Sequence, residues 1–130
     1  MSCMSLSTCI VGAAVAVSDM QRAREFYEGK LGLTGSDDPD GGRTYQCAGE
    51  TTIHVFPSPN AGKTGATVAG WTAPDLEQLV DELSARGVTF EHYDTPPFVT
   101  NARGIAELGG GKSAWFKDPD GNILHVLSMK

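Results

Sequence analysis

A duplicated sequence pattern constrains the fold of this chain more than any other feature. The segment 52–56, Thr-Ile-His-Val-Phe, has a counterpart at 123–127, Ile-Leu-His-Val-Leu, and each carries one histidine inside an apolar run. Further landmarks recur in the same order in the two halves: Asp19 and Asp75, Gly32 and Gly87, and Gly42 and Gly111. Because residue types and order agree, the sequence predicts two tandem modules of similar structure.

Each module is predicted to have the element order β-α-β-β-β. In module one, an apolar strand at about 9–17 leads into a helix that Ser18 and Gln21 begin as a capping box. In module two, a strand at about 67–72 leads to Pro74 as the first helical residue. The remaining strands are expected at about 33–36, 43–48, 52–56, 88–92, 112–117 and 123–127. The prediction is a single α+β domain over residues 1–130, with module one at about 8–57, a linker at about 58–65 and module two at about 66–130.

Charge and hydropathy narrow the classes of partner. The 130 residues carry a formal net charge of −6, which disfavours nucleic-acid binding because that requires a basic face. No apolar run approaches the roughly 18–20 residues of a membrane span, so no membrane partner is expected. The three cysteines, Cys3, Cys9 and Cys47, are an odd number without metal-type spacing, and a reduced, cytoplasmic protein is therefore expected.

Two identical segments, Asp-Pro-Asp-Gly at 38–41 and at 118–121, look like the start of a calcium loop. Neither is followed by the remaining ligands of such a loop. Proline at the second position and glycine at the fourth are typical of type I turns. Both segments are therefore expected to close hairpins.

Four short motifs are spread over nearly the whole chain: Val-Ser-Asp at 17–19, Arg-Glu-Phe-Tyr at 24–27, Leu-Gly-Leu at 31–33, and Ala-Trp-Phe-Lys-Asp-Pro-Asp-Gly-Asn at 114–122. Together with the paired modules, they resemble the vicinal oxygen chelate superfamily, which contains glyoxalases, bleomycin-resistance proteins and extradiol dioxygenases. The resemblance implies the glyoxalase/bleomycin resistance fold, in which two β-α-β-β-β modules form a curved mixed sheet around a cleft. The motifs specify the fold better than the chemistry, because they are mostly caps, turns and core residues.

The residues at the metal-binding positions implied by this resemblance depart from the metal-dependent pattern. Such members take one ligand from the first strand and one from the last strand of each module, normally a His and a Glu. Gly12 and Val68 occupy the first-strand positions and cannot bind a metal, whereas His54 and His125 occupy the last-strand positions. Two imidazoles alone would make a weak site, because catalytic zinc normally needs three protein ligands. No cofactor is therefore expected, and a divalent metal, if bound, would use His54 and His125.

A ligand cleft is expected on the face of the sheet that points away from the helices. Gly12, Ala14 and Ala16 share one face of the first strand, and their small side chains leave room there. If His54 and His125 point to the same side, two imidazoles enter this cavity. The insertion at 95–111 is expected to be a lid or a binding loop. The predicted ligand-binding residues are Gly12, His54, Val68, Gly70, Phe98, Asn101, Arg103, Trp115 and His125.

Three functions are consistent with these features. The preferred one is binding or sequestration of a small organic ligand, cationic or aromatic, in a cleft that has lost the family metal. The second is a metal-independent lyase or isomerase in which His54 or His125 acts as a general base. The third, a metal-dependent enzyme of the glyoxalase or dioxygenase type, is disfavoured by Gly12 and Val68. A homodimer is expected, with the modules paired within one chain or exchanged between two.

Overall fold

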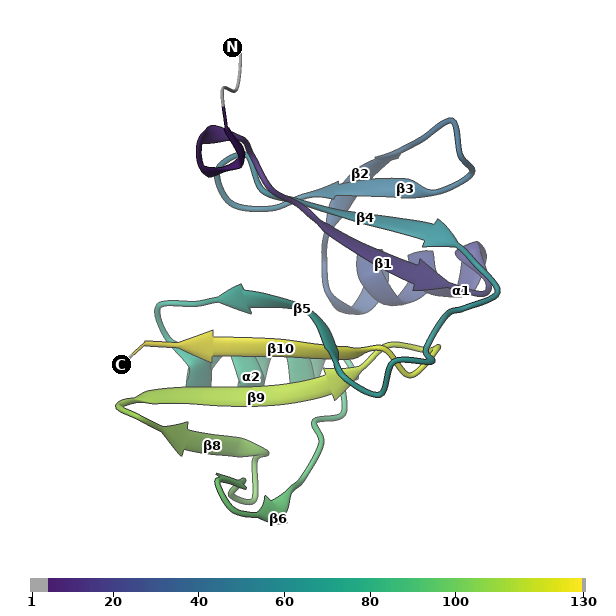
Figure 1. The fold of residues 1–130 in the computed structure, drawn as a ribbon. Coiled ribbons are helices and arrows are strands. Elements are labelled where there is room, and N and C mark those ends of the chain that lie inside the picture. The colour runs from purple at the N-terminus through teal and green to yellow at the C-terminus, as the bar shows by residue number, and fades with distance from the viewer. Residues whose placement is uncertain (1–4, 130) are drawn as a thin grey trace.

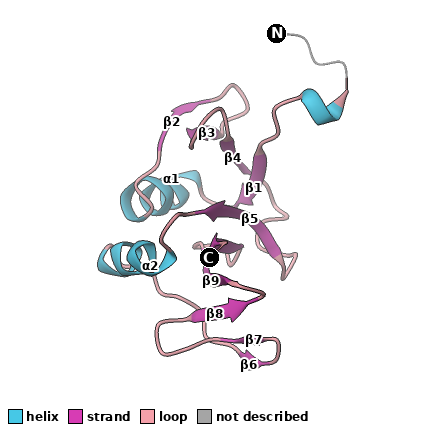
Figure 2. Ribbon diagram, turned by 90° about the vertical axis from the view of Figure 1, so that its left-hand side faces the viewer, coloured by secondary structure: helices cyan, strands magenta, loops and turns pink. Residues whose placement is uncertain are grey.

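The computed structural model describes residues 5–129 as two four-stranded sheets, a small hairpin and flanking helices. Figure 1 shows one sheet above the other, and Figure 2 shows both main helices on the same side of the molecule. The first sheet has the strand order β1 (Ala13–Val17), β4 (Thr52–Pro57), β3 (Arg43–Gln46), β2 (Thr34–Asp37). The second has the order β5 (Thr67–Thr72), β10 (Ile123–Ser128), β9 (Gly111–Lys117), β8 (Ile105–Leu108).

The two sheets repeat one pairing scheme, which confirms the predicted α+β fold. In each sheet the first strand of the module lies parallel to the last, and the other neighbours are antiparallel. A parallel pair needs a long crossover, and here it includes a helix. These helices are α1 (Met20–Arg24), which continues as the π-helix η2 (Glu25–Lys30), and α2 (Leu76–Ala85). The edge strands β1 and β5 contact each other, so the sheets meet along this line.

The prediction of a strand at 88–92 is wrong. This segment makes one isolated bridge, between Phe90 and Phe116, and the strand that pairs with the edge of β9 is β8. Between them the chain leaves the sheet and forms a separate hairpin of β6 (Asp94–Thr95) and β7 (Phe98–Val99). The second half of the expected 95–111 loop therefore belongs to the sheet. The apolar run at 88–92 is typical of an edge strand. It carries no sign that an inserted hairpin follows and that a later segment, β8, takes the edge of the sheet.

Aspartates cap both helices at their N-termini. The carboxylates of Asp19 and Asp75 accept hydrogen bonds from backbone N–H groups of the first turn. Asp19, rather than the predicted Ser18, is therefore the N-cap of the first helix, and Pro74 lies before the N-cap Asp75 instead of at the first helical position. Both helices are followed by a glycine in the left-handed conformation, as predicted: Gly32 with φ of 75° and Gly87 with φ of 98°.

The larger apolar side chains of the strands lie under the helices, as predicted from the strand period. Val15 and Val17 on β1 are buried, and so are Ile53 and Val55 on β4. Burial of such side chains is the main source of stability in a domain of this size. The fully buried side chains that fill this layer are Tyr27, Tyr45, Leu76, Val80, Phe116, Leu124 and Val126. Neither α1 nor α2 covers the opposite face of the sheets (Figure 2).

The turn between β9 and β10 joins the two modules by hydrogen bonds. The buried carboxylate of Asp118 accepts from the Tyr27 hydroxyl, on η2, at 2.8 Å. Asn122 donates its side-chain N–H to the Ala16 carbonyl on β1 at 2.8 Å. Burial, and then the Asp118 carboxylate, raise the pKa of Tyr27 well above its usual value, so its hydroxyl keeps its proton and donates. A predicted hairpin turn is therefore also a clamp across the module boundary.

The structure bears on the expected absence of a membrane partner and on the expected redox state of the cysteines. Among residues 5–129, no helix has the length and apolar character needed to cross a membrane. Cys47 is a free thiol, whereas Cys9 is disulfide-bonded, so the expectation of reduced cysteines does not hold for Cys9. Cys3 lies outside the described residues.

Candidate functional site

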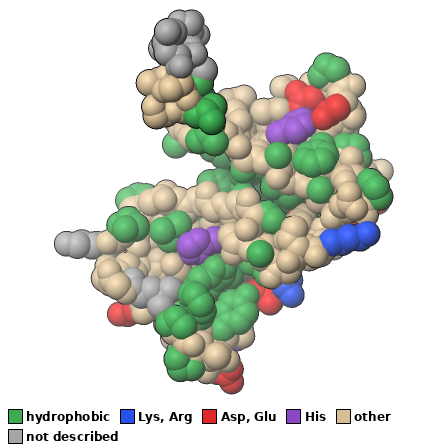
Figure 3. All heavy atoms as spheres, in the orientation of Figure 1, with side chains coloured by type: hydrophobic (Ala, Val, Ile, Leu, Met, Phe, Trp, Pro, Cys, Tyr) green, Lys and Arg blue, Asp and Glu red, His purple; other side chains and the backbone are tan. Residues whose placement is uncertain are grey.

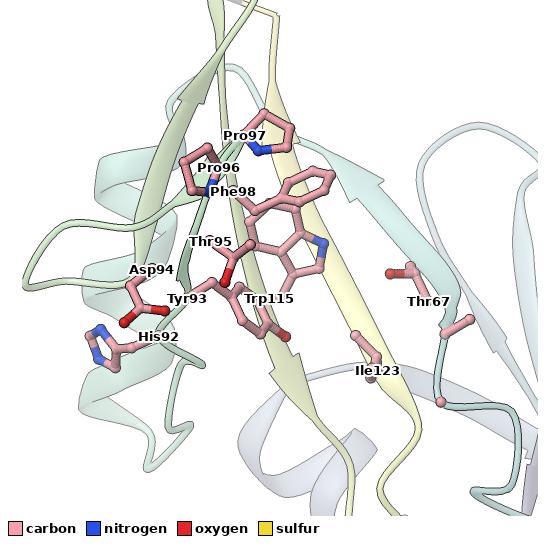
Figure 4. A pocket seen from close by; sticks show the side chains of 12 residues that line it. Thr67, His92, Tyr93, Asp94, Thr95, Pro96, Pro97, Phe98, Trp115 and Ile123 are labelled. Atoms are coloured by element: carbon pink, nitrogen blue, oxygen red, sulfur yellow. The ribbon is translucent and has the colours of Figure 1, made fainter.

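A pocket of about 570 Å³ lies between the β6–β7 hairpin and strands β5, β9 and β10 (Figure 4). Trp115 stands near its centre, Pro96 and Pro97 lie above it, and Thr67 and Ile123 lie on the opposite side from the hairpin. We call this the hairpin pocket. Pockets for small organic ligands typically have volumes of about 300–1,000 Å³. The hairpin pocket is therefore large enough for such a ligand.

Aromatic rings surround Trp115 in the hairpin pocket. The Tyr93 ring lies 5.6 Å from the indole centroid at an interplanar angle of 71°, and the Phe98 ring lies 5.7 Å away at 87°. The imidazole of His125 lies parallel to the indole, at 5.1 Å and 8°. Such edge-to-face and stacked pairs fix ring positions and offer π surface to a ligand. Trp115 itself is 8% exposed, so its ring is held firmly.

His125 supports Trp115 from the neighbouring strand β10. Its Nε2 atom is buried and has no hydrogen-bond partner among the described residues. Burial lowers the pKa of His125, because a charged imidazole loses hydration in this position. The ring is therefore neutral at neutral pH and packs against the indole as an apolar group.

Protein stability is expected to fall as the pH drops below about 6.5, and His125→Phe is expected to lessen that fall. Because the folded pKa lies below the unfolded value of 6.5, the unfolded chain binds a proton before the folded chain does. The stabilising contribution is full above pH 6.5 and is lost as the pH falls through the folded pKa. Phenylalanine keeps the stack on Trp115 without a titratable group. Urea unfolding at about pH 7.5 and about pH 5 measures the difference, and an equal loss in both proteins would contradict the assignment.

His54 lies in a different, polar environment on β4. Its Nδ1 is 2.9 Å from an Asp38 oxygen, and its Nε2 is 2.8 Å from an Asp40 oxygen. The first Asp-Pro-Asp-Gly segment is a hairpin turn, as predicted, since Gly41 N–H donates to the Asp38 carbonyl. Its two carboxylates fold back onto the imidazole. Hydrogen bonds from the Gly42 N–H, and then from His54, hold the pKa of Asp40 below its usual value.

The two repeated histidines therefore do not share one set of partners. His54 belongs to the first sheet and lies among carboxylates, whereas His125 belongs to the second sheet and lies against an indole. Figure 3 shows histidine side chains at two separate places on this face, one bordered by acidic and one by hydrophobic side chains. Asp38, Asp40 and His54 form a group of potential metal ligands, with ligand atoms within 4.8 Å of one another, and His125 is not part of it.

The small residues predicted to line a cleft border a second, smaller pocket. Gly12 and Gly70 line a space of about 280 Å³ between strands β1, β4 and β5, together with Cys47. Val68 packs against the hydrophobic core and is not among the lining residues of either pocket. Of the predicted ligand-binding residues, the structure therefore brings Phe98, Trp115 and His125 together, and it leaves Gly12 and Gly70 at a separate place.

The other two predicted contacts in the insertion have structural partners instead. The Asn101 side-chain oxygen accepts from the backbone N–H groups of Arg103 and Ile105 at 2.9 and 3.0 Å, which shapes the turn into β8. The Arg103 guanidinium pairs with Glu77 and Asp81 on α2. Neither residue lines the hairpin pocket.

Tyr93 and Asp94 line the hairpin pocket but were not among the predicted site residues. His92 is exposed and also lines it. The sequence held one usable signal, a cluster of aromatic, proline and polar residues at 92–98 inside an insertion, which is common in binding loops. The predicted lid at 95–111 begins three residues after the start of this cluster.

Residues 10–126 match the Glyoxalase/Bleomycin resistance protein/Dioxygenase superfamily. The chain belongs to this superfamily. Membership agrees with the resemblance drawn from the motifs and with the paired β-α-β-β-β modules. The comparison with curated proteins gave no match.

Three solved structures share the fold of this chain at low sequence identity. TnmS3, an antibiotic binding protein from Streptomyces sp. CB03234, has a TM-score of 0.66 at 23% identity, over 93% of this chain and 95% of that one. A superfamily member from Sphaerobacter thermophilus gives 0.64 at 24%, over 93% and 97%. A lactoylglutathione lyase from Agrobacterium tumefaciens gives 0.64 at 21%, over 93% of both chains.

The donor set does not fit the superfamily's four-ligand metal site. Gly12 and Val68 carry no donor atom. His54 has a carboxylate against each ring nitrogen, so an ion bound there would displace at least one of these hydrogen bonds. The free ring nitrogen of His125 is buried. The group of Asp38, Asp40 and His54 could hold a cation of its own, but only His54 stands at a position of the superfamily's pattern, because Asp38 and Asp40 lie in the turn between β2 and β3.

Proposed function

We propose that this chain binds a small organic ligand in the hairpin pocket by aromatic and apolar contacts, without turning it over. The observation that carries the proposal is the set of rings around Trp115, which presents π surface in a pocket of about 570 Å³. Ligand pockets are mostly apolar, with a few polar groups that set orientation. The tyrosine hydroxyl, the threonines and Asp94 supply those groups here.

A sequestering role agrees with the description of one of the structural neighbours. A structural neighbour is described as an antibiotic binding protein, and another as a lactoylglutathione lyase, so the fold serves both binding and catalysis. The balance favours binding in this chain, because the family's metal-binding positions have lost two of their four donors at Gly12 and Val68. A cytoplasmic setting agrees with the free thiol of Cys47 but not with the disulfide of Cys9.

The second candidate is a metal-independent lyase or isomerase that uses His125 as a general base. The observation in its favour is the neutral imidazole with an unpaired ring nitrogen. A base must come within about 2.6–3.2 Å of the proton that it removes. Because Nε2 is buried, neighbouring side chains would have to move before a substrate could reach it. Binding without turnover needs no such movement.

Self-association into a homodimer is part of the proposal. Three large apolar side chains near the N-terminus are exposed: Leu6, Ile10 and Val11, at 90%, 66% and 79%. Leu6 begins the short helix η1 (Leu6–Thr8), and Ile10 and Val11 lie between this helix and β1. The segment projects from the body of the molecule (Figure 1). Neighbouring exposed apolar side chains often mark a protein interface.

Binding of 2-naphthol, a neutral planar probe, tests the proposed function. Saturable binding is expected by isothermal titration calorimetry, and Phe98→Ala should weaken it about fivefold, which corresponds to about 1 kcal/mol for one lost ring contact. Phe98 is 46% exposed, so its removal should leave the fold intact.

Phe56→Ala is the matched control for this titration. Phe56 is an aromatic residue on β4, in the first sheet, and it stacks on His54 rather than lining the hairpin pocket. Its removal should leave 2-naphthol binding unchanged. The proposal fails if wild-type protein does not bind the probe, or if Phe56→Ala weakens binding as much as Phe98→Ala does.

A further inference from the structure

The rings of Tyr93 and Phe98 pack against the indole of Trp115 in the lining of the hairpin pocket. Tyr93 and Phe98 are both steeply inclined to the indole of Trp115, at 71° and 87°. A planar ligand much larger than 2-naphthol needs a long parallel face, which steeply inclined rings restrict. A compact cation needs several rings around it, because each ring face attracts positive charge through its quadrupole. The arrangement of Tyr93, Phe98 and Trp115 fits the second requirement.

An unpaired carboxylate accompanies these rings. Asp94, on β6, lines the hairpin pocket, and its carboxylate makes no hydrogen bond or ion pair with any residue in the described part of the chain. Some exposed carboxylates have a basic partner, as Asp37 has in Arg43, whereas Asp94 has none among the described residues. In Figure 4, Asp94 lies beside His92 at one end of the pocket, and Tyr93 lies between Asp94 and Trp115. A negative charge without an internal partner is therefore available to a ligand.

The charges around the pocket leave this negative charge uncompensated. None of the residues that line it is a lysine or an arginine. His125 stacks on Trp115, and burial lowers its pKa, so it adds no positive charge behind the indole at neutral pH. His92 is the titratable cation among the lining residues, and it is exposed to solvent at the rim.

We infer that the ligand of the hairpin pocket carries a compact cation, a quaternary ammonium or a protonated amine, held by Trp115, Tyr93 and Phe98 and paired with Asp94. This rests on the proposed function, because it names the ligand class of the same pocket. The aromatic rings bind the cation by cation–π attraction, which other apolar side chains do not provide. The carboxylate supplies selection by charge.

Two probes of the same shape test this inference: (4-hydroxyphenyl)trimethylammonium and its uncharged isostere 4-tert-butylphenol. Hydration alone favours the uncharged probe in an apolar pocket, so preference for the cation is diagnostic. The cation is expected to bind at least about tenfold more tightly in calorimetric titrations at neutral pH. Asp94→Asn should remove most of this preference, because it should weaken binding of the cation and leave the affinity for 4-tert-butylphenol unchanged. Glu50→Gln is the control and should change neither value, because Glu50 is an exposed acid on the β3–β4 turn, outside the lining of the pocket.

The outcomes separate this inference from the proposed function. Equal binding of the two probes, or a cation preference that Asp94→Asn leaves intact, overturns the inference while the pocket remains a binding site. Binding of 2-naphthol without binding of either phenol also overturns the inference alone. If none of the three probes binds, the proposed function fails and the inference fails with it.

Discussion

Asp118→Ala is expected to lower the free energy of unfolding by about 3–5 kcal/mol, a large part of the about 5–15 kcal/mol typical of a whole domain. The Asp118 carboxylate is 5% exposed and accepts hydrogen bonds from the Tyr27 hydroxyl, from the Asn122 side chain and from two backbone N–H groups of its own turn. Alanine would leave these buried donors without partners. Each unsatisfied buried group costs about 1–3 kcal/mol. Urea unfolding followed by circular dichroism gives the value.

Asp38→Ala is the matched control, because Asp38 holds the same position in the other Asp-Pro-Asp-Gly turn. Its side chain is 26% exposed and contacts Thr44 and His54 near the surface. Pairs exposed to this degree contribute at most about 1 kcal/mol. A loss of about 1 kcal/mol or less is therefore expected for Asp38→Ala. Equal losses in the two variants would show that the clamp across the module boundary does not stabilise the fold.

The two Asp-Pro-Asp-Gly segments illustrate how far sequence reasoning reaches in this chain. Their turn chemistry follows from proline and glycine positions, and both turns form as predicted. Their different roles depend on what lies opposite in three dimensions: helix η2 faces Asp118, whereas strand β4 faces Asp38. No local pattern contains that information. The duplication predicts the fold because both modules pair their strands in the same way. It does not predict the environments of the repeated residues.

The candidate site was harder to predict for the same reason. His54 and His125 occupy matching strand positions, yet one is surrounded by carboxylates and the other stacks on Trp115. The pocket instead depends on the β6–β7 hairpin, which has no counterpart in module one. Repetition carries no signal for an inserted element. Trp115 and Phe98 were recognised as candidates, but their contact with Tyr93 depends on how the insertion folds back.

Trp115→Ala is expected to weaken 2-naphthol binding about 30- to 100-fold, which corresponds to about 2–3 kcal/mol. The indole contacts Tyr93, Phe98 and His125 and is the ring that the others surround. Its removal takes away the largest π surface of the pocket and the support that orders its neighbours. The effect should exceed that of Phe98→Ala, because Phe98 forms only one wall.

Trp115→Phe separates loss of ring surface from loss of fold. Phenylalanine keeps a ring between Phe98 and His125 but with less area, so about a 3- to 10-fold loss of affinity is expected. Because Trp115 is 8% exposed, each variant is first checked by circular dichroism and thermal unfolding. Only folded variants are then titrated.

Calorimetric titration of 2-naphthol into wild-type protein and folded Trp115→Ala protein tests the central claim most directly. The account predicts saturable binding to one site in the wild type and an affinity at least about 30-fold lower in the variant. Binding to folded Trp115→Ala protein within twofold of the wild type, or no binding to the wild type, would contradict the hairpin pocket as the ligand site.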